Sequence, residues 1–264
     1  MPFAESTEGS IFYQMDGRGE PLIMLLPQSR GPRGVNALID LLSKKFNVIR
    51  YDQIGTGRSH LGSGNYDLSI PNRANEVATV LDSLAIESAN LLCHSTGCGI
   101  GLATAYMLNK RVKSLILINP WSYADDYIST MQRLRISAAN NLSPYDYAHF
   151  NFTMLFPAQY RRLYQKEFEQ IAVKAISQPH NPDQIKNRLE AILEYDTREI
   201  ASKVSCSTLA ITSNDDILMP NWHAAEIVEN IPNSCLTTLR YGGHMLPETR
   251  GKRILSEICD FLIN

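Results

Sequence analysis

The chain has 264 residues, with 25 Lys and Arg against 27 Asp and Glu, a formal net charge of −2. This length suits one or two domains with a full core, and the balanced charge argues against a dedicated nucleic-acid binder, which would show a basic excess. The chain lacks the ~20-residue apolar run of a membrane span, and its polar start, MPFAESTEGS, lacks the apolar stretch of a secretory signal. We expect a cytoplasmic protein with no nucleic-acid or membrane partner, as either a monomer or a homodimer.

The cysteines and histidines do not form a metal-binding pattern. The five cysteines are odd in number and include no C-x-x-C pair, and the six histidines include no H-x-x-x-H pair. We expect reduced, mostly buried thiols. The sequence also lacks a phosphate-binding P-loop and a dinucleotide fingerprint, so no metal and no nucleotide cofactor are expected.

Short apolar runs alternate with amphipathic segments along most of the chain. In chain order, the pattern predicts strands and helices as follows: strands over 10–15 and 21–27, a helix over 35–42, a strand over 46–51, a helix over 70–84, a strand over 89–93, a helix over 97–108, a strand over 112–118, a strand over 208–212, a helix over 222–230, a strand over 235–240 and a helix over 253–262. Apolar strands flanked by helices predict an α/β fold, with a mostly parallel twisted sheet covered on both faces.

The alternation breaks between residues 121 and 202. This segment lacks strand runs, reads as helical and holds about half of the aromatic residues. We interpret 1–120 and 203–264 as one core domain and 121–202 as a helical cap inserted over one edge of the sheet. The aromatic rings form either the cap's own core or the wall of an apolar pocket.

The most specific motif is Cys93-His94-Ser95-Thr96-Gly97, where a predicted strand meets a predicted helix. It is a variant of G-x-S-x-G, in which a serine sits on a sharp turn with its hydroxyl exposed above the sheet. Small residues on either side let the strand and the helix approach closely. Gly97 meets this need, whereas Cys93 replaces the usual glycine; His94 is interpreted as structural.

Two further signals follow later strands. Asp215 and Asp216 come after the strand predicted over 208–212, and His244 follows the strand predicted over 235–240. Because parallel strands end at one edge of the sheet, these groups are expected beside Ser95. The order Ser, Asp, His is the one that a nucleophile elbow of this kind requires.

The segments PLIMLLP, VIRYDQIGTGRS, LLCHSTGCGIGLA, LILINP, ITSNDDILMP and RYGGHMLPE carry a resemblance over essentially the whole chain. The chain resembles the α/β-hydrolase superfamily, and within it the branch of RutD-type aminoacrylate hydrolases and enol-lactone hydrolases. The resemblance implies the α/β-hydrolase fold. It also favours Asp216, four positions before Pro220, as the acid; Asp215 and the pair at 125–126 are the alternatives.

The roles follow from the triad template. Ser95 is the expected nucleophile, His244 the general base and Asp216 the group that orients the imidazole. Thr96 N–H is expected to be one donor of the oxyanion hole. The resemblance places the second donor after the 21–27 strand, where Ser29 is the first choice and Gln28 the second; relatives usually have His-Gly there, and this chain does not.

The substrate pocket is expected to involve Trp121, Tyr123, Phe156 and Arg30. Trp121 could equally pack the cap, and Arg30 could bind a substrate carboxylate or be solvated. Asp52, with the Arg58-Ser59 pair, is interpreted as holding its loop.

The sequence therefore predicts a cofactor-independent serine hydrolase whose partner is a small-molecule substrate. The expected substrate is a small or medium, partly apolar ester, lactone or amide-like compound, cleaved through an acyl-enzyme. The alternative is a small-molecule receptor, or a non-hydrolytic enzyme such as a cyclase or a C–C bond-cleaving enzyme, on the same scaffold.

Overall fold

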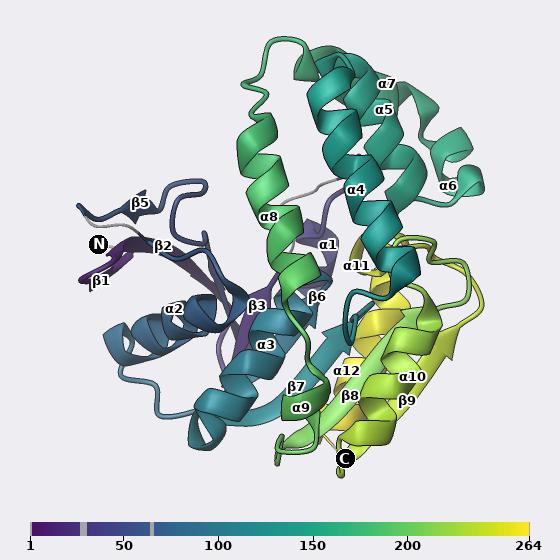
Figure 1. The fold of residues 1–264 in the computed structure, drawn as a ribbon. Coiled ribbons are helices and arrows are strands. Elements are labelled where there is room, and N and C mark those ends of the chain that lie inside the picture. The colour runs from purple at the N-terminus through teal and green to yellow at the C-terminus, as the bar shows by residue number, and fades with distance from the viewer. Residues whose placement is uncertain (1, 27–30, 64–65, 264) are drawn as a thin grey trace.

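The computed structural model describes residues 2–26, 31–63 and 66–263. In these ranges nine strands form one sheet in the order β1-β2-β4-β3-β6-β7-β8-β9, with β5 paired to β2 (Figure 1). The strands are β1 Phe3–Ser6, β2 Gly9–Asp16, β3 Glu20–Leu25, β4 Phe46–Tyr51, β5 His60–Leu61, β6 Ala89–His94, β7 Val112–Ile118, β8 Ser207–Ser213 and β9 Ser234–Leu239. β2 is antiparallel to its neighbours, and the pairs from β4 through β9 are parallel.

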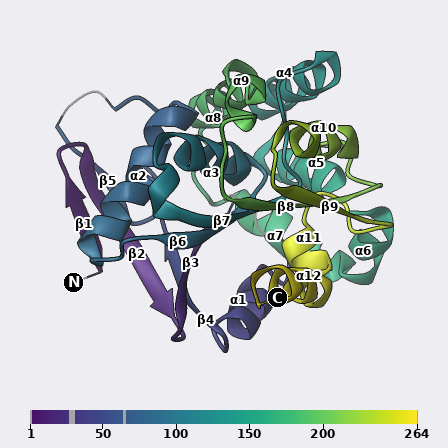
Figure 2. The same cartoon turned by 90° about the horizontal axis from the view of Figure 1, so that it is seen from below.

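Helices cover both faces of this sheet, as Figure 2 shows. One face carries α2 (Ile70–Ser83), α3 (Thr96–Met107) and α10 (Asn221–Asn230), and the other carries α1 (Asn36–Leu42) and α12 (Gly251–Ile263) beside the short α11 (Leu246–Thr249). A single 3₁₀ turn, Asn109–Arg111, precedes β7. Every residue of β6 is buried, which is why apolar residues follow one another at 91–93 without alternating with polar ones. The predicted α/β class is confirmed.

Six helices occupy the segment between β7 and β8, where we predicted a cap. They are α4 Asp126–Asn141, α5 Pro144–Leu155, α6 Ala158–Leu163, α7 Gln165–Ala175, α8 Pro182–Glu194 and α9 Arg198–Ala201. The side chains of Asp125, Ser143 and Asn181 accept hydrogen bonds from the first turns of α4, α5 and α8, which fixes where these helices begin. Helices α4–α8 stand above the sheet in Figure 1, with α8 packed on α4 and α7 on α5.

The two ends of this segment meet at one point. Thr197 donates to the Ser122 carbonyl twice, through its backbone N–H at 2.8 Å and its hydroxyl at 2.7 Å. Both residues are buried. The chain therefore leaves and re-enters the core side by side.

The sequence pattern did not predict β1 and β5, which are short and lie beside β2 at the margin of the sheet. No helix in the described ranges combines the length and the apolar character needed to traverse a lipid bilayer.

Candidate active site

Ser95 lies between β6 and α3, with φ 54° and ψ −121°. A non-glycine residue with positive φ is strained, and such strain collects at functional sites. The turn is held by two backbone hydrogen bonds: Ser95 N–H donates to the Ile118 carbonyl at 3.0 Å, and Cys98 N–H donates to the Ser95 carbonyl at 2.7 Å. The start of α3 directs backbone N–H groups toward this turn, which favours negative charge there.

Glycines in the first turns of α3 allow the helix to pack close to the sheet. A Cβ on Gly97 would lie 2.2 Å from the Leu25 carbonyl oxygen, so this position tolerates no side chain. A Cβ on Gly101 would lie 2.4 Å from the Cys93 sulfur. The glycine at position 101 therefore leaves room for the cysteine that replaces the usual glycine of the elbow.

Three predicted residues form one hydrogen-bonded chain. His244 Nε2 lies 2.8 Å from Ser95 Oγ, and His244 Nδ1 lies 2.8 Å from Asp216 Oδ2. The three residues come from the turns after β6, β8 and β9, and all are buried. The structure thus brings together the serine, the histidine and the acid that the sequence analysis selected.

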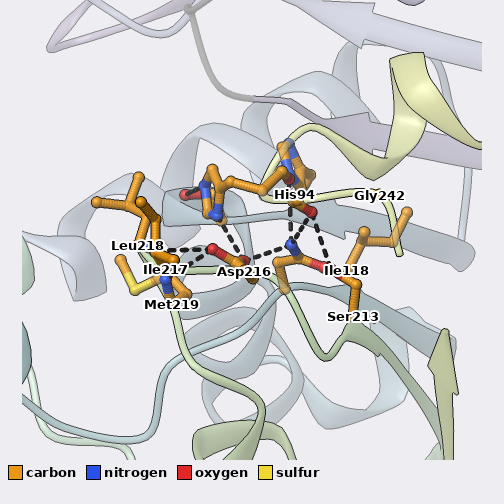
Figure 3. Close-up of polar contacts among 12 residues, drawn as sticks. His94, Ile118, Ser213, Asp216, Ile217, Leu218, Met219 and Gly242 are labelled. Carbon is orange, nitrogen blue, oxygen red and sulfur yellow. Dashed lines mark hydrogen bonds and ion pairs between the residues drawn. The ribbon is translucent and has the colours of Figure 1, made fainter. Parts of the chain in front are cut away.

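Asp216 is held in place by four donors. Its Oδ1 accepts from the backbone N–H groups of Leu218 at 2.8 Å and Met219 at 3.0 Å, while its Oδ2 accepts from Asn119 Nδ2 and pairs with His244 (Figure 3). The other acids have different roles. Asp215 Oδ1 accepts from the Gly242 and Gly243 N–H groups at 2.9 and 2.8 Å, so it holds the turn that carries His244.

The alternative pair at 125–126 lies at the start of α4, where Asp125 caps the helix. Asp52 holds its loop as expected, since its carboxylate accepts from Arg58 N–H at 2.9 Å.

Asn119 is a site residue that the sequence analysis missed. It follows β7 with φ 49°, and its Nδ2 also lies 3.1 Å from the carbonyl oxygens of Gly243 and His244. One amide therefore ties the acid to the histidine turn. The available signal was an asparagine at the end of a buried strand, because asparagine tolerates the left-handed conformation better than most residues.

His94 supports the histidine turn from the other side. Its Nε2 lies 2.7 Å from the His244 carbonyl oxygen, so that nitrogen carries the proton. Its Nδ1 is buried and has no hydrogen-bond partner in the part of the chain that the structure describes. Burial, with a smaller effect of the nearby His244, lowers the pKa of His94 to about 3, so the ring stays neutral.

The residues predicted for the oxyanion hole belong to two parts of the chain. Thr96 is the first residue of α3 and lines the cavity beside Ser95. Ser29 and Gln28 lie outside the described residues. Further along the chain, the Glu248 carboxylate accepts hydrogen bonds from the backbone N–H groups of Gly31 and Arg33, both at 3.0 Å, which ties these two residues to α11.

A cavity of about 340 Å³ adjoins Ser95 and His244. Its described wall consists of residues from the core and from the segment between β7 and β8: Leu26, Gln53, Leu68, Ile70, Arg73, Ser95, Thr96, Gly97, Arg135, Tyr147, Asn151, Leu155, Ile185, Arg188, Leu189, Ala191, Ile192, Leu218, His244 and Met245. This volume suits a small substrate.

The aromatic residues selected for the pocket lie elsewhere. Trp121 is fully buried and packs against the backbone of α3 at Gly99. The Tyr123 ring stacks under the Arg198 guanidinium, and Phe156 packs on Tyr160 in the aromatic core of the predicted cap. None of these three rings is among the described wall residues, because each ring packs against a neighbour away from the cavity.

Arg30, the fourth residue selected for the pocket, lies outside the described residues. Within the described ranges, no group of three or more His, Cys, Asp and Glu side chains is placed to hold a metal ion.

The fold and the site define a class of protein. A parallel sheet with a serine at a strained strand–helix elbow, followed by an acid and a histidine after later strands, is the architecture of a hydrolase. The chain is a hydrolase on an α/β scaffold.

Comparison with known proteins supports the same class of protein. The family model for the alpha/beta hydrolase fold matches residues 26–250, and the chain belongs to this family. A relative from Azorhizobium caulinodans, named as a carbamate hydrolase (RutD), is 27% identical over 92% of this chain and 91% of its own length. Another of that name, from Stutzerimonas stutzeri, is 28% identical over 88% of this chain and 89% of its own.

Solved structures resemble the fold closely. The enol-lactonase from Burkholderia xenovorans LB400 aligns over 100% of both chains with a TM-score of 0.81 and 22% identity. An alpha/beta hydrolase enzyme from a Medee basin deep-sea metagenome library, MGS-M2, aligns over 99% of this chain and 97% of its own with a TM-score of 0.87 and 19% identity.

Proposed function

We propose that the chain is a serine hydrolase that cleaves a small ester, lactone or amide-like substrate through an acyl-enzyme. The observation that supports this most directly is the position of His244, whose two ring nitrogens lie 2.8 Å from Ser95 Oγ and from Asp216 Oδ2. This is the arrangement in which a histidine can accept the hydroxyl proton while a carboxylate stabilises the resulting imidazolium.

In acylation, Ser95 Oγ forms a bond to the substrate carbonyl carbon while its proton moves to His244 Nε2. The tetrahedral intermediate then collapses: the bond to the leaving oxygen or nitrogen breaks, and that atom takes the proton from His244. In deacylation a water gives its proton to His244, its oxygen bonds to the acyl carbon, and Ser95 leaves with the proton.

The oxyanion of each intermediate needs donors that are already oriented. We propose Thr96 N–H as one, since it follows the nucleophile at the start of α3. For the second donor we propose Ser29, with Gln28 as the alternative.

The predicted cap also enters this proposal. Side chains from α4, α5 and α8 complete the wall of the cavity next to Ser95, so we propose that these helices form the lid of the site. The names of the relatives, a carbamate hydrolase and an enol-lactonase, support a substrate with a carbonyl bonded to nitrogen or oxygen.

The test is covalent labelling with a fluorophosphonate, read by intact mass, together with hydrolysis of short p-nitrophenyl esters. The wild type is expected to gain one adduct and to turn over the esters, and Ser95→Ala is expected to do neither. Ser122→Ala is the matched control, because Ser122 is a buried serine that hydrogen-bonds to a different histidine, His223. A folded wild type that is neither labelled nor active would refute the proposal and favour a receptor on the same scaffold.

A further inference from the structure

The acid of the candidate triad lies on a loop, residues 214–219, that joins β8 to α10. This acid loop contains no helix or strand, so no regular ladder of hydrogen bonds fixes its peptide groups. Asp216, Leu218 and Met219 are buried, whereas Ile217 is 44% exposed. The N–H groups of Leu218 and Met219 donate to Asp216 Oδ1 (Figure 3). The orientation of these two peptides therefore determines where the carboxylate lies.

One of these peptides is held from outside the loop. The hydroxyl of Tyr127, in the first turn of α4, donates to the Ile217 carbonyl at 2.7 Å. This carbonyl and the Leu218 N–H belong to the same peptide group, which is trans, so they point in opposite directions. No backbone N–H of residues 2–26, 31–63 or 66–263 donates to the Ile217 carbonyl. Tyr127 therefore holds one side of a peptide whose other side donates to Asp216 at 2.8 Å.

The result is a continuous chain of hydrogen bonds from α4 to the triad. It runs from the Tyr127 hydroxyl through one peptide group to the Asp216 carboxylate, whose Oδ2 lies 2.8 Å from His244 Nδ1. Hydrogen bonds in such a chain polarise one another, so a donor on the carbonyl strengthens the bond that the N–H donates. Burial, together with the negative charges of Asp216 and Asp125, raises the pKa of Tyr127. The hydroxyl therefore keeps the proton that it donates.

Tyr127 is itself held against the core. Its ring meets the Trp222 ring edge-on, with the ring centres 5.8 Å apart. Trp222 lies in α10, and its Nε1 donates to Asp125 Oδ2 at 3.2 Å. Asp125 Oδ1 accepts from Ile128 N–H at 2.7 Å and so caps α4. One carboxylate thus fixes both the start of α4 and the ring against which Tyr127 packs.

Helix α4 also reaches the cavity next to Ser95. Arg135, about two helical turns beyond Tyr127, is one of the wall residues. The helix therefore contacts the cavity at one point and, through Tyr127, the loop that carries the acid at another. The chemistry proposed above assigns no role to this second contact.

We propose that Tyr127 is a positioning residue for the triad and acts through Asp216. Its hydroxyl fixes the orientation of one peptide group, and the N–H of that peptide holds the carboxylate for its contact with His244. This inference rests on the proposed hydrolase function and adds to it a residue from the segment between β7 and β8. Without the hydroxyl, the acid loop is held less firmly and the average distance between Asp216 and His244 rises.

The experiment compares two substitutions of the tyrosine. Tyr127→Phe removes the hydroxyl and keeps the ring on Trp222, whereas Tyr127→Ala removes both. Tyr145→Phe is the matched control, because this tyrosine belongs to α5 in the same segment and its hydroxyl donates to Glu169 at 2.9 Å instead of to the acid loop. Thermal unfolding gives the Tm of each variant, and the kinetics are measured well below the lowest Tm.

Tyr127→Phe is expected to lower kcat for p-nitrophenyl acetate by about three- to tenfold, the range for the loss of one neutral hydrogen bond. KM should stay unchanged, because acylation and deacylation both use His244. Tyr127→Ala should lose at least as much, and Tyr145→Phe should match the wild type. A purely structural hydrogen bond would lower the Tm and leave kcat unchanged. An unchanged kcat in Tyr127→Phe, or a rise in KM without a fall in kcat, would overturn the inference.

A second measurement does not depend on turnover. The proton between His244 Nδ1 and Asp216 Oδ2 should give a far-downfield signal in proton NMR, which Asp216→Asn removes and so identifies. Tyr127→Phe is expected to shift this signal upfield, because a carboxylate that is held less firmly forms a longer and weaker hydrogen bond. Tyr145→Phe should leave it in place. A signal at the same position in the wild type and Tyr127→Phe would also overturn the inference.

The two measurements separate this inference from the proposed function. If the wild type hydrolyses the ester and Tyr127→Phe changes neither kcat nor the signal, the positioning role is wrong and the hydrolase stands. If the wild type hydrolyses no ester but the signal shifts in Tyr127→Phe, the proposed function is wrong and the link from α4 to Asp216 stands.

Discussion

His94→Gln should change how the stability of the protein depends on pH. In the native state His94 has a pKa of about 3, against an ordinary value of 6.5, because the ring is buried and, to a smaller extent, because His244 lies nearby. The native ring is neutral and the unfolded ring takes up a proton as the pH falls. The unfolded chain therefore binds more protons, so the stability is fully present above pH 6.5 and is lost as the pH falls toward 3.

The magnitude follows from the size of this shift. Each pH unit inside the window costs about 1.4 kcal/mol, so the single ring removes about 2 kcal/mol of the free energy of unfolding between pH 7 and pH 5. Glutamine places an amide donor near the position of Nε2 and can still bond to the His244 carbonyl, but it does not titrate. Any other titrating group contributes equally to both proteins and cancels in the comparison.

The assay is urea unfolding at pH 5, 6, 7 and 8, followed by circular dichroism and tryptophan fluorescence. The stability difference between wild type and His94→Gln should shift by about 2 kcal/mol in favour of the variant from pH 7 to pH 5. His60→Gln, which removes an exposed imidazole, shows whether the loss of any histidine changes the slope. If the free energy of unfolding depends on pH in the same way for the wild type and His94→Gln, the reasoning is refuted.

Three other substitutions probe the site. Asp216→Asn should lower kcat by roughly 10⁴-fold in a folded protein, because no carboxylate then stabilises the His244 imidazolium; an unchanged kcat would remove Asp216 from the triad. Gly97→Ala should abolish ester turnover and lower the Tm, since its Cβ would lie 2.2 Å from the Leu25 carbonyl oxygen, and a fully active variant would contradict this packing. Glu248→Ala removes the acceptor of two backbone N–H groups and should lower the free energy of unfolding by about 1–3 kcal/mol. Calorimetry should show this as a fall in Tm of about 2–4 °C per kcal/mol, and Glu248→Gln should lose less stability.

Strands of the sheet could be predicted from the sequence because each has a local signal. The strands β4 and β7 are apolar runs with a turn or Asn-Pro directly after them, and the structure gives them the predicted bounds, Phe46–Tyr51 and Val112–Ile118. Ser95, Asp216 and His244 were accessible for a related reason. Each lies just after a recognisable strand, so chain order predicts which groups meet at one edge of the sheet.

The cavity wall has no such local signal. Three arginines of the wall are far apart in the chain: Arg73, Arg135 and Arg188. Each belongs to an amphipathic helix, where an arginine is normally interpreted as solvent-exposed. Only the packing of α4 and α8 over the core brings them together. Of the aromatic rings in the predicted cap, Tyr147 lines the cavity, whereas Trp121 packs against α3, a neighbour that composition cannot reveal.

The junction at Ser122 and Thr197 bears on how enzymes of this architecture diversify. Because the segment between them starts and ends at adjacent points of the core, it can be replaced by a segment of different length without a change in the strand order of the sheet. Arg135 and Arg188 would be exchanged with it, whereas Ser95 and His244 belong to the scaffold that remains. A graft of this segment would exchange the part of the cavity wall that α4, α5 and α8 provide, while Ser95, His244 and the part of the wall that the core provides would stay in place.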